Sequence, residues 1–235
     1  MLIQILENWC RENHIPLNDK QKSDFETYAK MLVEWNEKMN LTAITAEEEI
    51  AVKHFIDSIS VLKYIDIKQN AKIIDIGTGA GFPGIPLKIM RPDIDLTLLD
   101  SLNKRLIFLE EVCKVIRAQA DIVHARAEEF SQKPAYREKF DVAVSRAVAN
   151  LPSLCEYCIP YVKKGGSFIS MKGSDGEKEL SLAQNAIAVL GGKADNVHTF
   201  TLPDHSTRTI ITVSKISLTP AKYPRRGTKI SKNPL

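Results

Sequence analysis

A glycine-rich segment directly follows the first strand-forming run of the chain. Residues 72–76 read Lys-Ile-Ile-Asp-Ile, and residues 77–84 read Gly-Thr-Gly-Ala-Gly-Phe-Pro-Gly. Glycines at a strand end let the chain turn sharply and let a ligand lie against bare backbone at the carboxyl edge of a parallel sheet. The G-x-G-x-x-G spacing of Gly79, Gly81 and Gly84 fits a dinucleotide site, and a tight turn without a ligand is the alternative.

The register of this turn separates two cofactors. In a dinucleotide fold the first glycine of the motif directly follows the strand, and here that glycine is Gly77. The sixth position of the motif is then Phe82, where a dinucleotide fold requires a glycine for close packing of the helix. Asp75 lies two residues before Gly77, and its carboxylate would repel a pyrophosphate but attract a sulfonium or ammonium group. The sequence therefore favours S-adenosylmethionine over NAD, with Asp75 and Gly79 expected at the cofactor. No Gly-Lys-Ser/Thr sequence is present, which excludes a P-loop.

Acidic residues follow the next two strand-forming runs. Asp100 ends the second run, about 20 residues beyond the glycine turn, where an acid accepts hydrogen bonds from a ribose diol. It could equally cap a helix that begins near Asn103. After the third run comes Arg126-Ala127-Glu128-Glu129, where a carboxylate or a backbone group could reach an adenine edge, or where a charged helix could begin.

The fourth run ends in Ser145-Arg146-Ala147 and carries no recognised catalytic motif. It lacks the Asn/Asp-Pro-Pro-aromatic sequence that holds exocyclic amines and the Pro-Cys pair that activates pyrimidine C5. An acceptor that is already nucleophilic, such as guanine N7, would need positioning and no general base. Arg146 could hold a phosphate or a guanine edge with two parallel hydrogen bonds, or pair with a carboxylate of its own chain.

Cysteine and histidine spacing predicts no metal site. Cys155-x-x-Cys158 has no second ligand pair, since Cys10 and Cys113 are isolated and the five histidines show no ligand spacing. The pair is expected to be buried in a helix. His54, between Lys53 and Phe55, is expected to be a packed, hydrogen-bonded residue.

Composition and charge bound the class of protein. The 235 residues are 44% hydrophobic and 26% charged, as in globular proteins, and no apolar run approaches the ~20 residues of a membrane-spanning helix. Without a signal-peptide pattern or a disulfide framework, the sequence predicts a cytoplasmic protein. Residues 205–235 contain seven Lys or Arg and no Asp or Glu, so all of the net positive charge of +3 lies there. This end is typical of a phosphate-binding arm, or of a solubilising terminus.

Hydrophobic periodicity predicts the elements that position these residues. Residues 1–70 have helical spacing, with start signals at Asn18/Gln21 and Thr45/Glu48. Five strand-forming runs then alternate with helical segments, which predicts a parallel sheet covered on both faces. Runs 193–200 and 208–216 are separated by too few residues for a crossover and must form an antiparallel hairpin.

The resulting prediction is an α/β, Rossmann-like methyltransferase fold with a mostly parallel seven-stranded sheet and a C-terminal antiparallel hairpin. Its boundaries are a helical N-terminal cap over residues 1–70, a methyltransferase domain over 71–218 and a basic tail over 219–235.

Six runs carry a resemblance to a known family. They are residues 35–43, 54–58, 75–87, 145–147 (Ser-Arg-Ala), 171–173 (Met-Lys-Gly) and 223–226 (Tyr-Pro-Arg-Arg). In this order, and with the glycine turn continuing into Phe-Pro-Gly-Ile-Pro, they closely resemble the ribosomal RNA small subunit methyltransferase G family, also called glucose-inhibited division protein B. The similarity runs from Trp35 to Leu235.

The resemblance implies a bacterial cytoplasmic enzyme that moves the methyl group of S-adenosylmethionine to N7 of one guanine of 16S rRNA near the decoding site. The partner would be 16S rRNA or the 30S particle, with the enzyme a monomer. The residues implied to contact the cofactor are Gly77, Phe82, Ala127, Glu128 and Arg146, with Asp100 at the ribose. Those implied to hold RNA are Arg126, Lys172, Arg225 and Arg226. Relatives often have Arg-Lys-Pro-Gly where this chain has Arg225-Arg226-Gly227.

Two other classes remain open on sequence grounds. One is a small-molecule methyltransferase or oxidoreductase, which would have little use for the acid-free basic tail. The other is a non-catalytic binding module, which would not need the cofactor turn.

Overall fold

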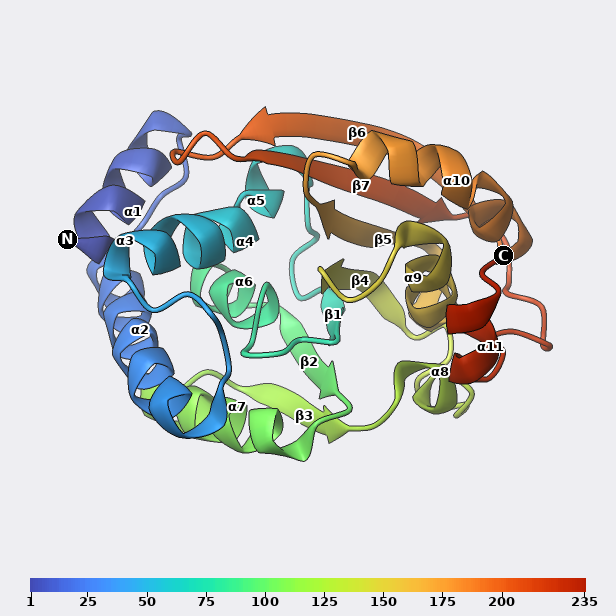
Figure 1. Ribbon diagram of the computed structural model, residues 1–235, viewed down its shortest axis with the longest axis horizontal. Helices are drawn as coiled ribbons and strands as arrows, with labels where there is room; N and C mark the ends of the chain where they lie inside the picture. The colour runs from blue at the N-terminus through green and yellow to red at the C-terminus, as the bar shows by residue number, and fades with distance from the viewer.

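The computed structural model describes residues 1–235 and contains one seven-stranded sheet in the order β3-β2-β1-β4-β5-β7-β6 (Figure 1). The strands are β1 (Lys72–Ile76), β2 (Asp95–Asp100), β3 (Ala120–His124), β4 (Phe140–Arg146), β5 (Val162–Lys172), β6 (Gly192–Thr201) and β7 (Thr207–Lys215). Strands β1 to β5 pair in parallel, and β7 is antiparallel to both β5 and β6. The predicted parallel sheet and C-terminal hairpin are confirmed.

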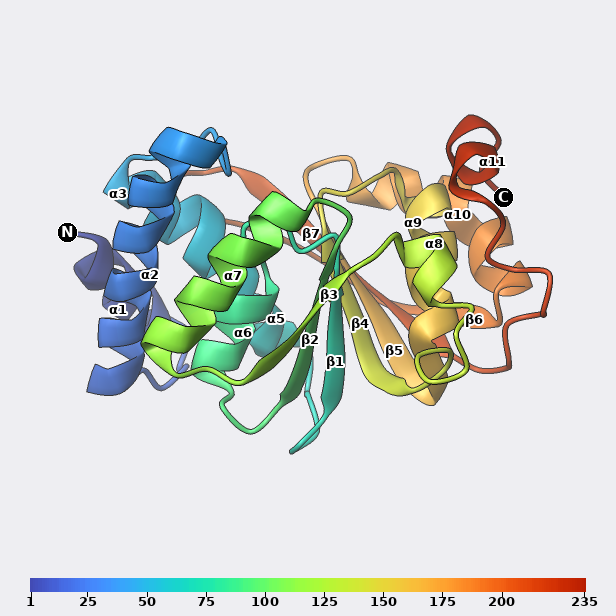
Figure 2. The same ribbon diagram turned by 90° about the horizontal axis from the view of Figure 1, so that it is seen from below.

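Helices cover both faces of the sheet (Figure 2). The N-terminal segment forms α1 (Leu2–Glu12), α2 (Asp19–Met39), α3 (Glu47–Glu49), the π-helix η1 (Ile50–Ile56), α4 (Asp57–Ile59) and α5 (Val61–Tyr64), which lie on one face with α6 (Gly84–Met90) and α7 (Asn103–Ile116). The other face carries α8 (Ala127–Phe130), α9 (Leu151–Cys158), the short η2 (Ile159–Tyr161), α10 (Gly176–Val189) and α11 (Gly227–Lys232).

The two helix starts predicted from sequence have different outcomes. Asn18 and Gln21 form a reciprocal capping box at the start of α2, which confirms the first. The Thr45/Glu48 signal is wrong by one residue, because Ala46 is the N-cap of α3 and no side chain caps that helix. Residues 45–48 are exposed, so water can satisfy the free N–H groups there and a side-chain cap is not required.

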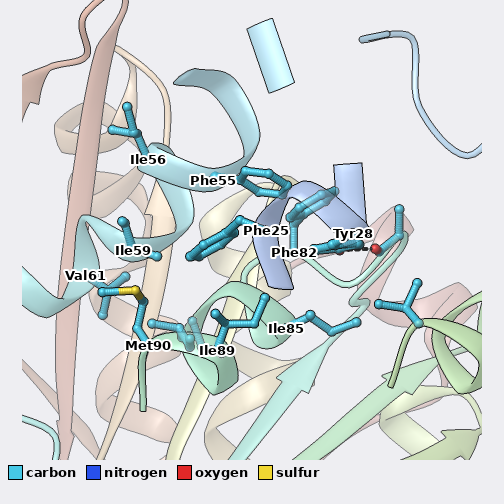
Figure 3. Packing of buried hydrophobic residues seen from close by; sticks show 14 of the residues in the cluster. Phe25, Tyr28, Phe55, Ile56, Ile59, Val61, Phe82, Ile85, Ile89 and Met90 are labelled. Atoms are coloured by element: carbon cyan, nitrogen blue, oxygen red, sulfur yellow. Dashed lines mark hydrogen bonds between the residues drawn. The ribbon is translucent and has the colours of Figure 1, made fainter. Parts of the chain in front are cut away.

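The N-terminal helices share their core with the sheet. One cluster of 40 buried residues contains Phe25 of α2 and Phe55 of η1 together with Phe82 of the glycine turn and Phe108 of α7. Figure 3 shows Phe25, Phe55 and Phe82 packed side by side. Residues 1–70 are therefore packed as one layer of the molecule, which fixes η1 against the edge where the parallel strands end.

The cysteines have the predicted environment. Cys155 and Cys158 lie buried in α9, and burial raises the pKa of both thiols well above the usual range. No group of three His, Cys, Asp or Glu side chains could hold a metal ion, and no helix is both long and apolar enough to cross a bilayer.

Candidate cofactor and RNA site

The glycine turn lies between the end of β1 and the start of α6. Gly79 has a φ of +61°, a backbone conformation that L side chains rarely adopt. A Cβ built there would meet no atom nearer than the carbonyl oxygen of Gly77, at 4.0 Å. Because Gly79 lines a large cleft, the missing side chain leaves open space against bare backbone, as a cofactor requires.

Asp75 holds this turn from inside the protein. It is fully buried, and its Oδ2 accepts hydrogen bonds from Thr78 Oγ1 at 2.7 Å and from the backbone N–H of Gly84 at 2.8 Å. Burial raises the pKa of Asp75 to about 6. Its Oδ1 is buried without a hydrogen-bond partner. Asp75 does not line the cleft, so its direct contact with a ligand stays a prediction, while its bonds to the turn are structural facts.

Asp100 connects the end of β2 to the same turn. Its Oδ2 accepts a hydrogen bond from the backbone N–H of Gly79 at 2.9 Å and lies 3.3 Å from Arg105 Nη1, and its Oδ1 accepts from the N–H of Leu102 at 2.9 Å. Leu102 is the N-cap of α7, so Asp100 is not itself the cap residue. Asp100 lines the cleft, and its expected contact with a ribose diol stays a prediction.

The aromatic ring of Phe82 sits beneath a chain of polar groups. It stacks on the His54 ring, with ring centroids 4.3 Å apart and planes at 14°, and the Arg146 guanidinium lies 5.0 Å from its centroid. Arg146 Nη1 donates to the backbone oxygen of Lys53 and to Asp57 Oδ2, both at 2.9 Å, and Nη2 lies 3.2 Å from His54 Nδ1. Arg146 therefore pairs with a carboxylate of its own chain, which was one of the two readings of the sequence.

His54 is a neutral member of this chain of polar groups. Burial, and then the positive charge of Arg146, lower the pKa of His54 to about 3. Because Nδ1 faces the Arg146 donor, the ring proton resides on Nε2, which lies 2.9 Å from Thr42 Oγ1. His54 is thus the packed, hydrogen-bonded residue that the sequence predicted, and it holds the orientation of Arg146.

The cleft has a volume of about 1270 Å³ and runs along the carboxyl ends of the parallel strands. Its lining includes the predicted cofactor residues Gly77, Gly79, Phe82, Asp100, Ala127, Glu128 and Arg146, and the predicted RNA residues Arg126, Arg225 and Arg226. The structure thus brings together ten of the twelve residues proposed from sequence. Asp75 lies behind the turn, and Lys172 lines a separate, adjacent pocket.

The C-terminal segment folds back onto α9 beside this cleft. Arg225 makes a bidentate ion pair with Glu156, in which Nη2 lies 2.7 Å from Oε2 and Nε lies 3.0 Å from each carboxylate oxygen. Glu156 is fully buried, and it also accepts a bond from the backbone N–H of Arg225. This pairing holds one side of the Arg225 guanidinium against the protein, because a buried carboxylate cannot give up its only countercharge cheaply, and the expected contact of Arg225 with RNA stays a prediction. Arg226 is exposed.

Lys172 is also paired within the protein, and its expected contact with RNA stays a prediction. Its side chain is buried, and Nζ lies 2.5 Å from the backbone oxygen of Ala149 and 2.8 Å from Glu179 Oε2. Its charge fixes the loop after β4 to α10. Arg126 is exposed at the cleft, so Arg126 and Arg226 are the predicted RNA residues that present unpaired guanidinium groups.

Comparison with known proteins decides between the classes left open. The family model of rRNA small subunit methyltransferase G matches residues 21–210, which span the glycine turn, Asp100 and Arg146. The chain belongs to the rRNA small subunit methyltransferase G family. The ribosomal RNA small subunit methyltransferase G of Alkaliphilus metalliredigens is 50% identical over 98% of both chains. That of Clostridium novyi is 48% identical over 97% of this chain and 95% of its own.

Solved structures support the methyltransferase fold. TrmN from Thermus thermophilus aligns with a TM-score of 0.53 at 14% identity, covering 68% of this chain and 48% of that chain. A 16S rRNA (adenine(1408)-N(1))-methyltransferase from Catenulisporales acidiphilia aligns with a TM-score of 0.53 at 13% identity, covering 65% of this chain and 94% of its own. Membership of the rRNA small subunit methyltransferase G family makes S-adenosylmethionine the cofactor, and the reaction of the family is methylation of guanine N7 in 16S rRNA.

The residues of the cleft fit that cofactor. Open space at Gly79 admits a ligand against the backbone, Asp100 offers acceptors for a ribose diol, and the unpartnered Oδ1 of Asp75 leaves negative charge behind the turn. No lysine reaches the turn in the manner of a P-loop, and an acid stands where a pyrophosphate would be repelled.

Several residues of the site were not found by sequence reasoning. Asp57 holds Arg146 and Arg208, Tyr28 donates a hydrogen bond from its hydroxyl to the Ala80 oxygen, and Glu156 anchors Arg225. Asp57 could have been found from its position three residues after His54 in a helical run. Tyr28 and Glu156 left no local signal, because their partners lie 52 and 69 residues away.

We expect Asp100→Ala to weaken S-adenosylmethionine binding by about 10- to 150-fold, since a hydrogen bond to a charged acceptor contributes roughly 1.5–3 kcal/mol. The variant loses both the diol acceptor and the bond that holds Gly79. Calorimetric titration beside a thermal melt measures the two effects, with Asp100→Asn as a control that keeps an acceptor oxygen. A large fall in the melting temperature, with normal binding by the protein that remains folded, would show that Asp100 serves only the fold.

Proposed function

We propose that this chain transfers the methyl group of S-adenosylmethionine to N7 of one guanine of 16S rRNA near the decoding site, at the cleft formed by β1, β2 and β4. The observation that carries the proposal is the glycine turn, open at Gly79 and braced by Asp100 and Asp75, beside a cleft large enough for a cofactor and a nucleotide. Exposed Arg126 and Arg226 at this cleft support binding of an RNA backbone.

When bound, S-adenosylmethionine supplies an electrophilic methyl group on a positively charged sulfur. The residues of this chain hold the two substrates in line. Gly77, Gly79 and Asp100 hold the cofactor, and Phe82, which stacks on both His54 and Tyr28, forms a rigid wall beside it. Such fixed geometry can supply a large part of the rate enhancement through orientation alone.

No general base is needed for this reaction. The lone pair of guanine N7 lies in the ring plane and is free at neutral pH, so no proton has to leave before attack. The one histidine at the cleft, His54, has both ring nitrogens engaged, by Arg146 and Thr42, and its lowered pKa keeps it uncharged. Its role is to position Arg146.

The rate of methyl transfer should therefore be flat with pH. We expect single-turnover rates to be constant between about pH 7 and 8.5, where His54 is neutral and Asp75 is ionised. Below pH of about 6 Asp75 takes up a proton and cofactor affinity should fall. The folded-state pKa of Asp75 lies above its ordinary value of 3.8, so protonation favours the folded state, and this loss reports binding and not unfolding. A slope of one near neutrality that disappears in a single side-chain variant would reveal a base.

The function itself is tested by incubating the protein with labelled S-adenosylmethionine and unmodified 16S rRNA, either naked or in small-subunit particles. Mass spectrometry of nuclease fragments then locates the methyl group. We expect one 7-methylguanosine near the decoding site. The proposed enzyme is a monomer that acts in the bacterial cytoplasm. Methylation of another atom, or of small molecules only, would contradict the proposal.

A further inference from the structure

A second cavity adjoins the cofactor cleft. This side pocket has a volume of about 630 Å³, within the roughly 300–1,000 Å³ typical of small-molecule sites. It shares His54 and residues 146–149 with the cleft, so the two cavities meet at the segment after β4. Val148 in that segment is exposed, and Ile44 and Met171 add further apolar surface to the side pocket. A flat, partly apolar ligand therefore fits next to the cofactor.

One carboxylate of the side pocket has an acceptor atom to spare. Both carboxylate oxygens of Asp57 already have partners, because Arg146 donates to Oδ2 and Arg208 lies 3.3 Å from Oδ1. Glu179 Oε2 accepts from the backbone N–H of Leu151 at 2.6 Å and pairs with Lys172, whereas Glu179 Oε1 has no partner. Its side chain is 27% exposed. Glu179 is thus held in place through one oxygen and offers the other.

The chemistry of N7 methylation restricts how guanine can be recognised. The usual arginine contact uses O6 and N7, but N7 must stay free to face the methyl group. Discrimination therefore has to use the opposite edge, where guanine presents two donors, N1–H and the 2-amino group. A carboxylate oxygen carries two lone pairs, so one free oxygen can accept from both donors, whereas adenine would meet it with the lone pair of its N1.

We propose that the side pocket holds the target guanine base and that Oε1 of Glu179 accepts hydrogen bonds from its N1–H and 2-amino group. This inference rests on the proposed function. In the reaction the N7–CH₃ bond forms, the S–CH₃ bond breaks with its electron pair returning to sulfur, and no proton is transferred. Positive charge passes from sulfur to the purine, which makes N1–H a stronger donor. The bond to Glu179 therefore strengthens as the methyl group moves.

The test combines a protein variant with a base analogue. Inosine keeps N7, O6 and N1–H and lacks only the 2-amino group. It replaces the target guanine in ligated 16S rRNA, presented in whichever form the wild type accepts. We expect the wild type to prefer guanine over inosine by about 10- to 100-fold in kcat/KM. In Glu179→Gln the amide can still accept from Leu151 but places a donor opposite the 2-amino group, so the preference should fall to about one, with unchanged affinity for S-adenosylmethionine.

Glu177→Gln is the matched control, because it removes one negative charge from the same helix at an exposed residue that bonds to Thr199 and lies outside the side pocket. It should keep the wild-type preference. A guanine-to-inosine ratio that is the same in Glu179→Gln as in the wild type overturns the inference while N7 methylation stands. A wild-type ratio near one overturns it even if Glu179→Gln does not fold. Failure of the wild type to methylate N7 at all would instead overturn the proposed function, and the inference with it.

Discussion

Gly79→Val should lower the affinity for S-adenosylmethionine by at least about 100-fold, which corresponds to roughly 2.7 kcal/mol. The substitution places a branched side chain in space that the cofactor requires, at a position that lines the cleft. It also forces a β-branched residue to a φ of +61°, which disturbs the N–H that bonds to Asp100. Calorimetric titration with S-adenosylmethionine and NAD, side by side, measures the effect.

Gly165→Val provides the control for strain. Gly165 has a φ of +83° and open space around its Cβ, but it does not line the cleft. The two variants should lose similar stability in a thermal melt, and Gly165→Val should bind the cofactor as the wild type does. Equal loss of binding in both would attribute the effect to general destabilisation. Wild-type binding of NAD but not S-adenosylmethionine would reject the cofactor assignment.

Arg225→Ala should destabilise the protein by about 3–5 kcal/mol, because it leaves the fully buried Glu156 without its countercharge. Chemical denaturation measures this loss. Affinity for the cofactor should also fall, since Arg225 lines the cleft and the segment it anchors places Gly227 against Glu128.

Arg226→Ala is the matched comparison, since Arg226 is the next residue and is exposed. Its stability should be unchanged, and the log-log salt slope of RNA binding should flatten by about 0.7–0.9, the value for one phosphate contact. If Arg225→Ala instead flattened the slope without destabilising the fold, the Glu156 pair would not persist in solution and Arg225 would be an RNA contact.

The sheet could be predicted from sequence because its signals are local. Strand runs alternating with helical runs imply the parallel order, and six residues between 201 and 208 force the hairpin. The capping box of α2 is equally local. The start of α3 was misplaced because an exposed helix end does not need the side-chain cap that the pattern suggested.

The site was predicted where residues follow strand ends and missed where partners come from distant segments. Asp100 and Arg146 end β2 and β4, so topology brings them to one edge. The partners of Arg225 and Lys172 could not be foreseen, since Glu156 lies 69 residues before Arg225, and the sequence does not distinguish a paired lysine or arginine from an unpaired one. The sequence therefore located the basic residues but not the carboxylates that pair with them.

The π-helix η1 constrains how the length of this chain can vary. A π-helical turn holds more residues than an α-helical turn, so deleting one residue within Ile50–Ile56 could restore ordinary helical pitch without breaking the helix. The residues of the rewound segment would, however, take new positions around the helix axis. The Lys53 oxygen, His54 and Asp57, which converge on Arg146, could then no longer all reach it. The apolar positions of η1 are buried and accept only side chains of similar size, and insertions and deletions there should be eliminated by selection.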